Sequence, residues 1–176
     1  VLRKAGDKMK RTYDWIATGG SVRGASHKRN NLPNQDAIKW KEEKGNLVLA
    51  VSDGHGSRKH FRSDVGSELA VDAAIEVILE EVDVENLTAE VLNKTRERVK
   101  DKLPQRVINC WQDKVKSHYQ NNLFSLDREA QAKLKEIEAE QGMKVREKLE
   151  NNYNKAYGAT LLIVLISQKF SLYFKL

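Results

Sequence analysis

Two short apolar runs separated by polar residues form the pattern of a β-hairpin. Leu47–Val51 is continuously apolar and ends in a polar, glycine-containing stretch, and Ile38–Trp40 forms a shorter run before it. The polar residues 43–46 between the two runs suit a tight turn. Strands joined so closely pair antiparallel, so we expect Asp36, before the first run, and Asp53, after the second, at the same edge of a sheet.

The middle of the chain carries apolar residues at helical spacing. A stripe over residues 65–82 predicts a helix that packs on the sheet, with Ser63 or Asp64 as its N-terminal cap. A second stripe spans residues 89–115 and is broken or kinked at Pro104. These stripes are typical of core helices and do not indicate a cofactor site.

Residues 127–152 form a segment of different composition. Lys, Glu, Gln, Arg and Ala dominate it, and apolar side chains recur only every three or four positions. This spacing predicts a long, solvent-facing helix with Gly142 as a weak point. A helix that binds a partner as a coiled coil through its narrow apolar stripe is the alternative.

Strand patterns occur towards both ends of the chain. Leu161–Ile166 is a continuous aliphatic run typical of a strand buried on both faces, and Phe170–Phe174 begins another strand. Tyr13–Thr18 alternates large and small groups and is expected to be an edge strand. Strands, then helices, then strands again predict an α+β fold.

The polar stretch after Val51 contains groups that bind hard cations. Gly54 and Gly56 leave the backbone free to approach a ligand closely. Asp53 and a main-chain carbonyl then form an oxygen site suited to magnesium, manganese or calcium rather than zinc. A second carboxylate at Asp36 would repel the first unless a cation or a proton lay between them. The alternative is that Asp-Gly-His-Gly is only a polar turn.

A basic, Asn-rich loop over residues 22–33 leads directly to the first acidic residue. Arg29 suits bidentate binding of phosphate, whereas His27 would donate one hydrogen bond or orient a water. A solvated loop without a ligand is the alternative.

Composition narrows the functional classes. The 176 residues suit one domain, and the formal charge of +6 is interleaved with acidic residues, so we expect no nucleic-acid partner. The single Cys110 excludes internal disulfides and favours a reducing compartment. The longest apolar run is too short to span a bilayer. We therefore expect a cytoplasmic protein without membrane contact.

Four short motifs together resemble one enzyme family. They are Gly-x-Ser-His at 24–27, Pro-Asn-Gln-Asp-Ala at 33–37, Val-Ser-Asp-Gly-His-Gly at 51–56 and Tyr-Gly-Ala-Thr-Leu-Leu at 157–162. In this order they resemble the N-terminal part of a metal-dependent protein phosphatase of the PPM (type 2C) family, closest to its bacterial branch. The resemblance implies a β-sandwich flanked by helices, present here as an incomplete copy. Residues 18–176 would be the partial domain, and residues 1–17 a lead-in and first strand.

The resemblance also implies a mechanism, the hydrolysis of phosphoserine or phosphothreonine in a phosphorylated protein. Asp53 would bridge two Mn²⁺ or Mg²⁺ ions, with the Gly54 carbonyl and Asp36 completing the shell of one ion. A water activated by the two metals would attack phosphorus, and His55 would protonate the leaving oxygen.

The remaining implied roles concern phosphate and the outer shell of the metal. Arg29 or His27 would clamp the phosphate, although their spacing from the acidic pair differs from that in many relatives. Gln35 stands where many relatives carry Glu, which removes an anionic outer ligand and is expected to weaken metal affinity.

The family supplies further metal ligands from Asp-Gly and Asp-Asn motifs in a C-terminal half that this sequence does not contain. We therefore expect a fragment that is weakly active or inactive alone. One alternative is a non-catalytic relative that binds a phosphoprotein or a regulatory partner through the basic loop and residues 127–152. Another is an unrelated small α+β binding domain.

Overall fold

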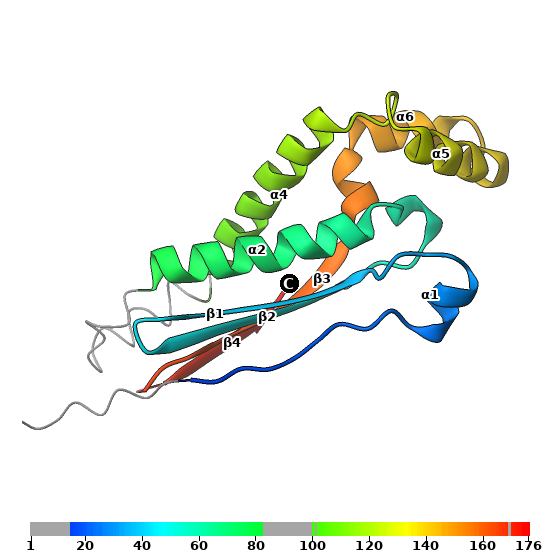
Figure 1. The fold of residues 1–176 in the computed structure, drawn as a ribbon. Coiled ribbons are helices and arrows are strands. Elements are labelled where there is room, and N and C mark those ends of the chain that lie inside the picture. The colour runs from blue at the N-terminus through cyan, green and yellow to red at the C-terminus, as the bar shows by residue number, and fades with distance from the viewer. Residues whose placement is uncertain (1–14, 83–99, 101, 169) are drawn as a thin grey trace, which may run out of the picture.

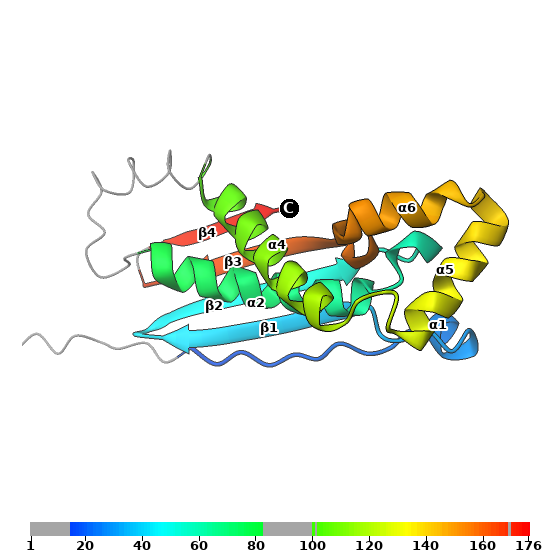
Figure 2. The same cartoon turned by 90° about the horizontal axis from the view of Figure 1, so that it is seen from above.

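The computed structural model describes residues 15–82, 100, 102–168 and 170–176. Their strands form one antiparallel sheet of four strands in the order β1-β2-β3-β4 (Figure 2). The strands are β1 (Asp36–Glu43), β2 (Asn46–Gly54), β3 (Ala159–Ile166) and β4 (Ser171–Lys175). The expected α+β class is confirmed. A second sheet, which a sandwich requires, is not present among these residues.

The β1–β2 hairpin has the predicted position and turn. Its two connecting residues, Lys44 and Gly45, both have positive φ values, 52° and 74°. Such a turn matches the twist of the strands that it joins, and glycine adopts this conformation without strain. The resulting register places Asp36 opposite Asp53, as the sequence predicts.

The third strand departs from its prediction. Only one face of β3 is buried, through Leu161, Ile163 and Leu165, whereas Leu162 is 42% exposed. The prediction of a strand buried on both faces is therefore wrong. The reason is that helices cover one face of the sheet only, as Figure 1 shows.

Helix α2 (Ser63–Glu81) lies along the covered face and confirms the predicted stripe (Figure 1). Its buried side chains, such as Ile78, join Val48 and Ile163 of the sheet in the main core. The predicted cap is wrong, because the N-cap is Arg62 and no side chain caps this helix.

Helix α4 (Leu103–Asn121) crosses over α2. Pro104 stands in its first turn, where a missing N–H costs no hydrogen bond, so the proline begins the helix instead of kinking it. Trp111 anchors the crossing, because its indole Nε1 donates a hydrogen bond of 3.0 Å to the Gly66 carbonyl. The part of the predicted second stripe at 89–99 lies outside the described residues.

The charged segment forms two helices, so the prediction of one long helix is wrong. They are α5 (Arg128–Gln141) and α6 (Lys144–Asn151), which are separated at Gly142 with φ 87°. Arg146 of α6 donates through Nε to Glu138 of α5 at 2.7 Å. The apolar stripe is buried in a second core with Phe124 and Tyr157, so it is not free to form a coiled-coil seam.

The N-terminal segment runs beside the sheet. Residues 15–24 have no regular structure, so the strand predicted over 13–18 is not formed in its described part, and residues 13 and 14 lie outside the described residues. The Trp15 indole donates to the Gly45 carbonyl at 2.9 Å, and the short helix α1 (Ala25–Arg29) follows (Figure 1). None of the described helices combines the length and apolarity needed to cross a membrane.

Candidate metal and phosphate site

Two carboxylates meet at the open end of the β1–β2 hairpin. Asp36 and Asp53 are cross-strand partners, and both side chains are exposed to solvent. Partial burial and the neighbouring charge of Asp53 raise the pKa of the Asp36 carboxyl, and a hydrogen bond between the two side chains acts in the same direction. The charge of His27 and a hydrogen bond from the Gly54 amide oppose this rise in the pKa of Asp36. The pair therefore favours binding of a proton or a cation.

Neighbouring polar groups fix the backbone of the acidic pair. The Asp36 carbonyl accepts hydrogen bonds from Ser21 Oγ at 2.9 Å and from Asn34 Nδ2 at 3.2 Å. On the other strand, Thr160 Oγ1 donates to the Asp53 carbonyl at 3.4 Å. These contacts hold both strand ends, so the separation of the carboxylates is set by the scaffold.

Gly54 occupies a position that only glycine fits. A Cβ there would lie 2.4 Å from the Gln35 carbonyl oxygen and 2.9 Å from that of Ser63. The Gly54 N–H donates to the Gln35 carbonyl at 3.1 Å. This close packing brings β1, β2 and the start of α2 together directly behind the two carboxylates.

His55 follows and packs against a second histidine that the sequence did not predict for the site. The rings of His55 and His60 meet edge to face with centroids 4.7 Å apart. The His55 N–H donates to the Gly158 carbonyl at 2.9 Å, and a Cβ at Gly158 would lie within 2.8 Å of ring nitrogens of both histidines. The Lys155 carbonyl holds His60 Nδ1, and burial lowers the pKa of His60.

A cavity of about 390 Å³ opens beside the acidic pair. Asp36 and Asp53 line it together with Thr160 of β3 and Lys175 of β4. Lys175 reaches this edge because it pairs with Leu162 across β3 and β4. Sequence reasoning missed Lys175, because nothing in its local sequence marks the register of β4.

The two predicted phosphate ligands lie on α1 and differ in their surroundings. His27 is half-buried, and its charge lowers the pKa of the Asp36 carboxyl. Arg29 is exposed, and its side chain forms no hydrogen bond or ion pair within the described part of the chain. Neither residue lines the cavity beside the acidic pair.

Gln35 points to the opposite side of the sheet from its acidic neighbour. Gln35 directly precedes β1, and its side chain is buried where that of Asp36 is exposed. Its Nε2 donates to Ser63 Oγ at 2.7 Å, on helix α2. The Gln35 side chain is therefore not an outer ligand of a metal at the acidic pair in this structure.

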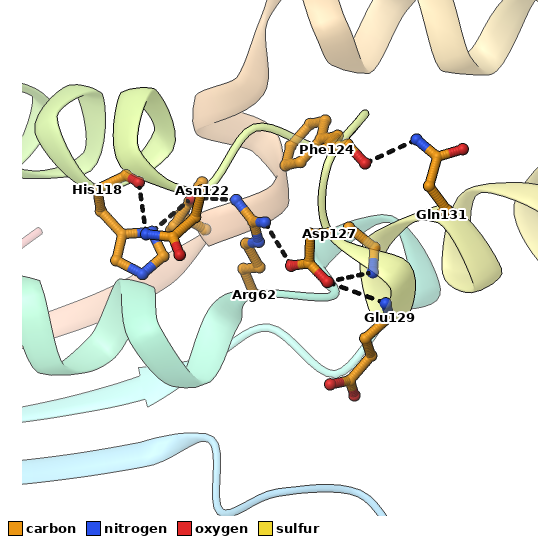
Figure 3. Close-up of polar contacts among 9 residues, drawn as sticks. Arg62, His118, Asn122, Phe124, Asp127, Glu129 and Gln131 are labelled. Atoms are coloured by element: carbon orange, nitrogen blue, oxygen red, sulfur yellow. Dashed lines mark hydrogen bonds and ion pairs between the residues drawn. The ribbon is translucent and has the colours of Figure 1, made fainter.

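Arg62 is buried, although the sequence around it reads as a mobile basic loop. Its guanidinium donates to Tyr157 Oη and to Asp127 Oδ2, each at 2.7 Å (Figure 3). Asp127 also caps α5 by accepting hydrogen bonds from the N–H groups of Glu129 and Ala130. This network, which links the segment after the acidic pair to α5, has no signature in the sequence.

The donor chemistry of the acidic pair fits a hard divalent cation such as Mg²⁺ or Mn²⁺, since carboxylate oxygens are the ligands that these ions prefer. No group of three or more His, Cys, Asp or Glu side chains that could hold a metal occurs in the residues that the structure describes. The pair alone would therefore supply only part of a coordination shell.

The family model for protein phosphatase 2C matches residues 23–176, a range that contains every site residue predicted from the sequence. The chain belongs to the protein phosphatase 2C family. Searches of curated proteins and of solved structures gave no significant match. Membership in the protein phosphatase 2C family explains the order of the four motifs and excludes the unrelated binding domain as an interpretation of Asp-Gly-His-Gly.

Proposed function

We propose that this chain hydrolyses phosphoserine or phosphothreonine in proteins with Mg²⁺ or Mn²⁺ held at the acidic pair. The observation that carries the proposal is the pairing of Asp36 with Asp53 in register at an exposed edge of the sheet. The charge of Asp53 raises the pKa of the Asp36 carboxyl, and a cation that replaces the proton there would offset the repulsion between the two side chains. The family match supports the phosphatase class.

The resemblance to the family supplies the ligand set of this proposal. Asp53, Asp36 and the Gly54 carbonyl would hold the ions. Magnesium takes about six oxygen ligands, so water, phosphate oxygens or further groups fill the remaining positions, and we expect weak binding by this chain alone. Bound divalent cations would lower the pKa of a water molecule and offset charge on the phosphate.

Residues of the chain itself would bind the phosphate and move the proton. His55 is solvent-exposed and held by its backbone contact with Gly158, so it is free to donate a proton to the leaving seryl or threonyl oxygen. His27 or Arg29 would bind the phosphate, and both lie on the short helix α1 that precedes the acidic pair in the sequence. Lys175 adds a positive charge on the wall of the cavity.

A non-catalytic relative that binds a phosphoprotein or regulatory partner is the second candidate. The observation that favours it is the partial ligand set, since the described residues place only two carboxylates at the site. Placement in the bacterial branch and in the cytoplasm stays a prediction.

Calorimetric titration with MnCl₂, run beside hydrolysis of p-nitrophenyl phosphate, tests both candidates. The variants are Asp53→Asn and, as a control of equal charge change, Asp113→Asn on the exposed side of α4. Binding and turnover that only Asp53→Asn abolishes support the enzyme. Binding without turnover supports the non-catalytic relative, and the absence of binding contradicts the metal site.

A further inference from the structure

A second cleft, of about 890 Å³, lies on the helix side of the sheet. Its walls come from residues 30–33, the turn at residues 56–62, the end of α4 and the start of α5. The cleft begins where the acidic site ends, because Gly56 follows the Asp53–His55 stretch directly and His60 contacts the His55 ring. Figure 1 shows α1 and α5 at this same end of the molecule.

The cleft contains a buried acceptor that lacks a partner. Gln35 is only 7% exposed, and its Oε1 forms no hydrogen bond in the described part of the molecule, although Nε2 is paired with Ser63. Gln35 lines the cleft next to Gly56, where the one atom within 4 Å of an added Cβ would be Gln35 Oε1, at 4.0 Å. Because this oxygen is sealed from solvent in the unbound chain, a ligand with a hydrogen-bond donor would satisfy it once a small movement of Gln35 turns it towards the cleft.

The charges that line the cleft leave a local negative excess. Each of the lining cations is already paired, in the ion pairs Arg62–Asp127, Lys133–Glu136 and Arg58–Glu140. Asp64 and Glu129 also line the cleft and form no ion pair in the described part of the chain. Figure 3 shows the Glu129 carboxylate pointing away from Arg62. The lining therefore suits a cationic, donor-rich ligand.

We propose that this cleft binds the residues beside the phosphorylated residue of a protein substrate and selects arginine or lysine there. The proposal rests on the proposed function only in placing the phosphate at the acidic pair. An extended peptide supplies backbone N–H groups for Gln35 Oε1 and cationic side chains for Asp64 and Glu129. The whole chain carries a formal charge of +6, so its overall field opposes a basic peptide and the selection comes from these local carboxylates.

Fluorescence anisotropy with labelled phosphothreonine peptides tests this proposal. One peptide carries arginine at the flanking positions and the other carries glutamine. We expect the parent chain to bind the arginine peptide about fivefold more tightly, because each partly exposed ion pair contributes modestly. The double variant Asp64→Asn, Glu129→Gln should lose this preference, whereas Glu68→Gln, Glu147→Gln, with equal charge change on exposed positions, should keep it.

A second variant tests the cavity itself. Gly56→Leu would fill the space beside Gln35 Oε1 and should weaken binding of both peptides. Equal affinity of the parent for the two peptides, or a preference that survives in the Asp64→Asn, Glu129→Gln variant, would overturn the proposal. Repeating the titrations in EDTA with unphosphorylated peptides tests the peptide cleft separately from the proposed metal site. The preference for the arginine peptide should persist under these conditions even if the acidic pair binds no metal.

Discussion

Asp36 and Asp53 stand directly opposite each other across the first hairpin, and the two-residue turn at the far end of that hairpin sets their register. A shift of the register by one residue would put one carboxylate on the other face of the sheet. The acidic pair thus depends on a turn at the opposite end of both strands. In the absence of a cation, this pair destabilises the hairpin, because like charges at directly paired positions repel each other.

Removing one of these charges should therefore stabilise the metal-free chain. We expect Asp36→Asn to raise the free energy of unfolding by about 0.2–1 kcal/mol at neutral pH, the range for a cross-strand pair. Urea denaturation in EDTA measures this change. Added MnCl₂ should raise the melting temperature of the parent and not that of the variant. A variant that is less stable than the parent in EDTA would contradict the prediction.

Contact between α2 and residues 153–157 should not tolerate a side chain at Gly66. A Cβ at Gly66 would lie 1.9 Å from the Tyr157 carbonyl oxygen, a backbone atom that cannot move alone. Gly66→Ala should cost about 3 kcal/mol of stability, despite the better helix propensity of alanine. Gly20→Ala is the control, because a Cβ at Gly20 has no atom within 4 Å. Equal urea midpoints for the two variants would refute this prediction.

Local patterns were sufficient for the elements that depend on neighbouring residues. The β1–β2 hairpin, the apolar stripe of α2 and the meeting of Asp36 with Asp53 follow from alternation, helical spacing and a short turn. Each of these features is decided within about twenty residues of sequence. The sequence alone therefore brings the two carboxylates together, as the structure does.

Features that depend on distant residues could not be predicted. Arg62 is buried because Asp127 and Tyr157 converge on it from far along the chain. The aliphatic run of β3 reads as buried on both faces, but which faces of a sheet are covered depends on the whole arrangement of helices. The charged segment divides at Gly142 because packing of α6 on α5 outweighs the continuous helical pattern.

The buried Arg62 should matter far more than an exposed arginine with a similar ion pair. Its side chain is 7% exposed, whereas that of Arg106, paired with Glu81 at the same 2.7 Å, is 56% exposed. Arg62→Met would leave Asp127 and the Tyr157 hydroxyl without their partner, and we expect a loss of about 3 kcal/mol. Arg106→Met should cost under about 1 kcal/mol. Chemical denaturation of both variants measures the two losses of stability. Similar losses for Arg62→Met and Arg106→Met would contradict the prediction.

His118 makes stability depend on pH through the same network. Its Nδ1 lies 2.9 Å from the Tyr157 hydroxyl, and burial together with the positive charge of Arg62 lowers its pKa. The unfolded chain therefore binds this proton at a higher pH than the folded chain does. By linkage, stability rises with pH through this window and is lost as the pH falls below about 6.5, the usual value for histidine.

The variant His118→Gln should flatten this dependence while keeping a polar contact with Tyr157. Between pH 7 and pH 5, the unfolding free energy should depend less steeply on pH in this variant than in the parent. The decrease in slope should correspond to at most about one proton bound on unfolding. Some slope should remain, because burial also lowers the pKa of His60, which acts with the same sign. Urea titrations at a series of pH values measure both slopes. An unchanged slope in His118→Gln would show that this imidazole keeps its ordinary pKa in the folded chain.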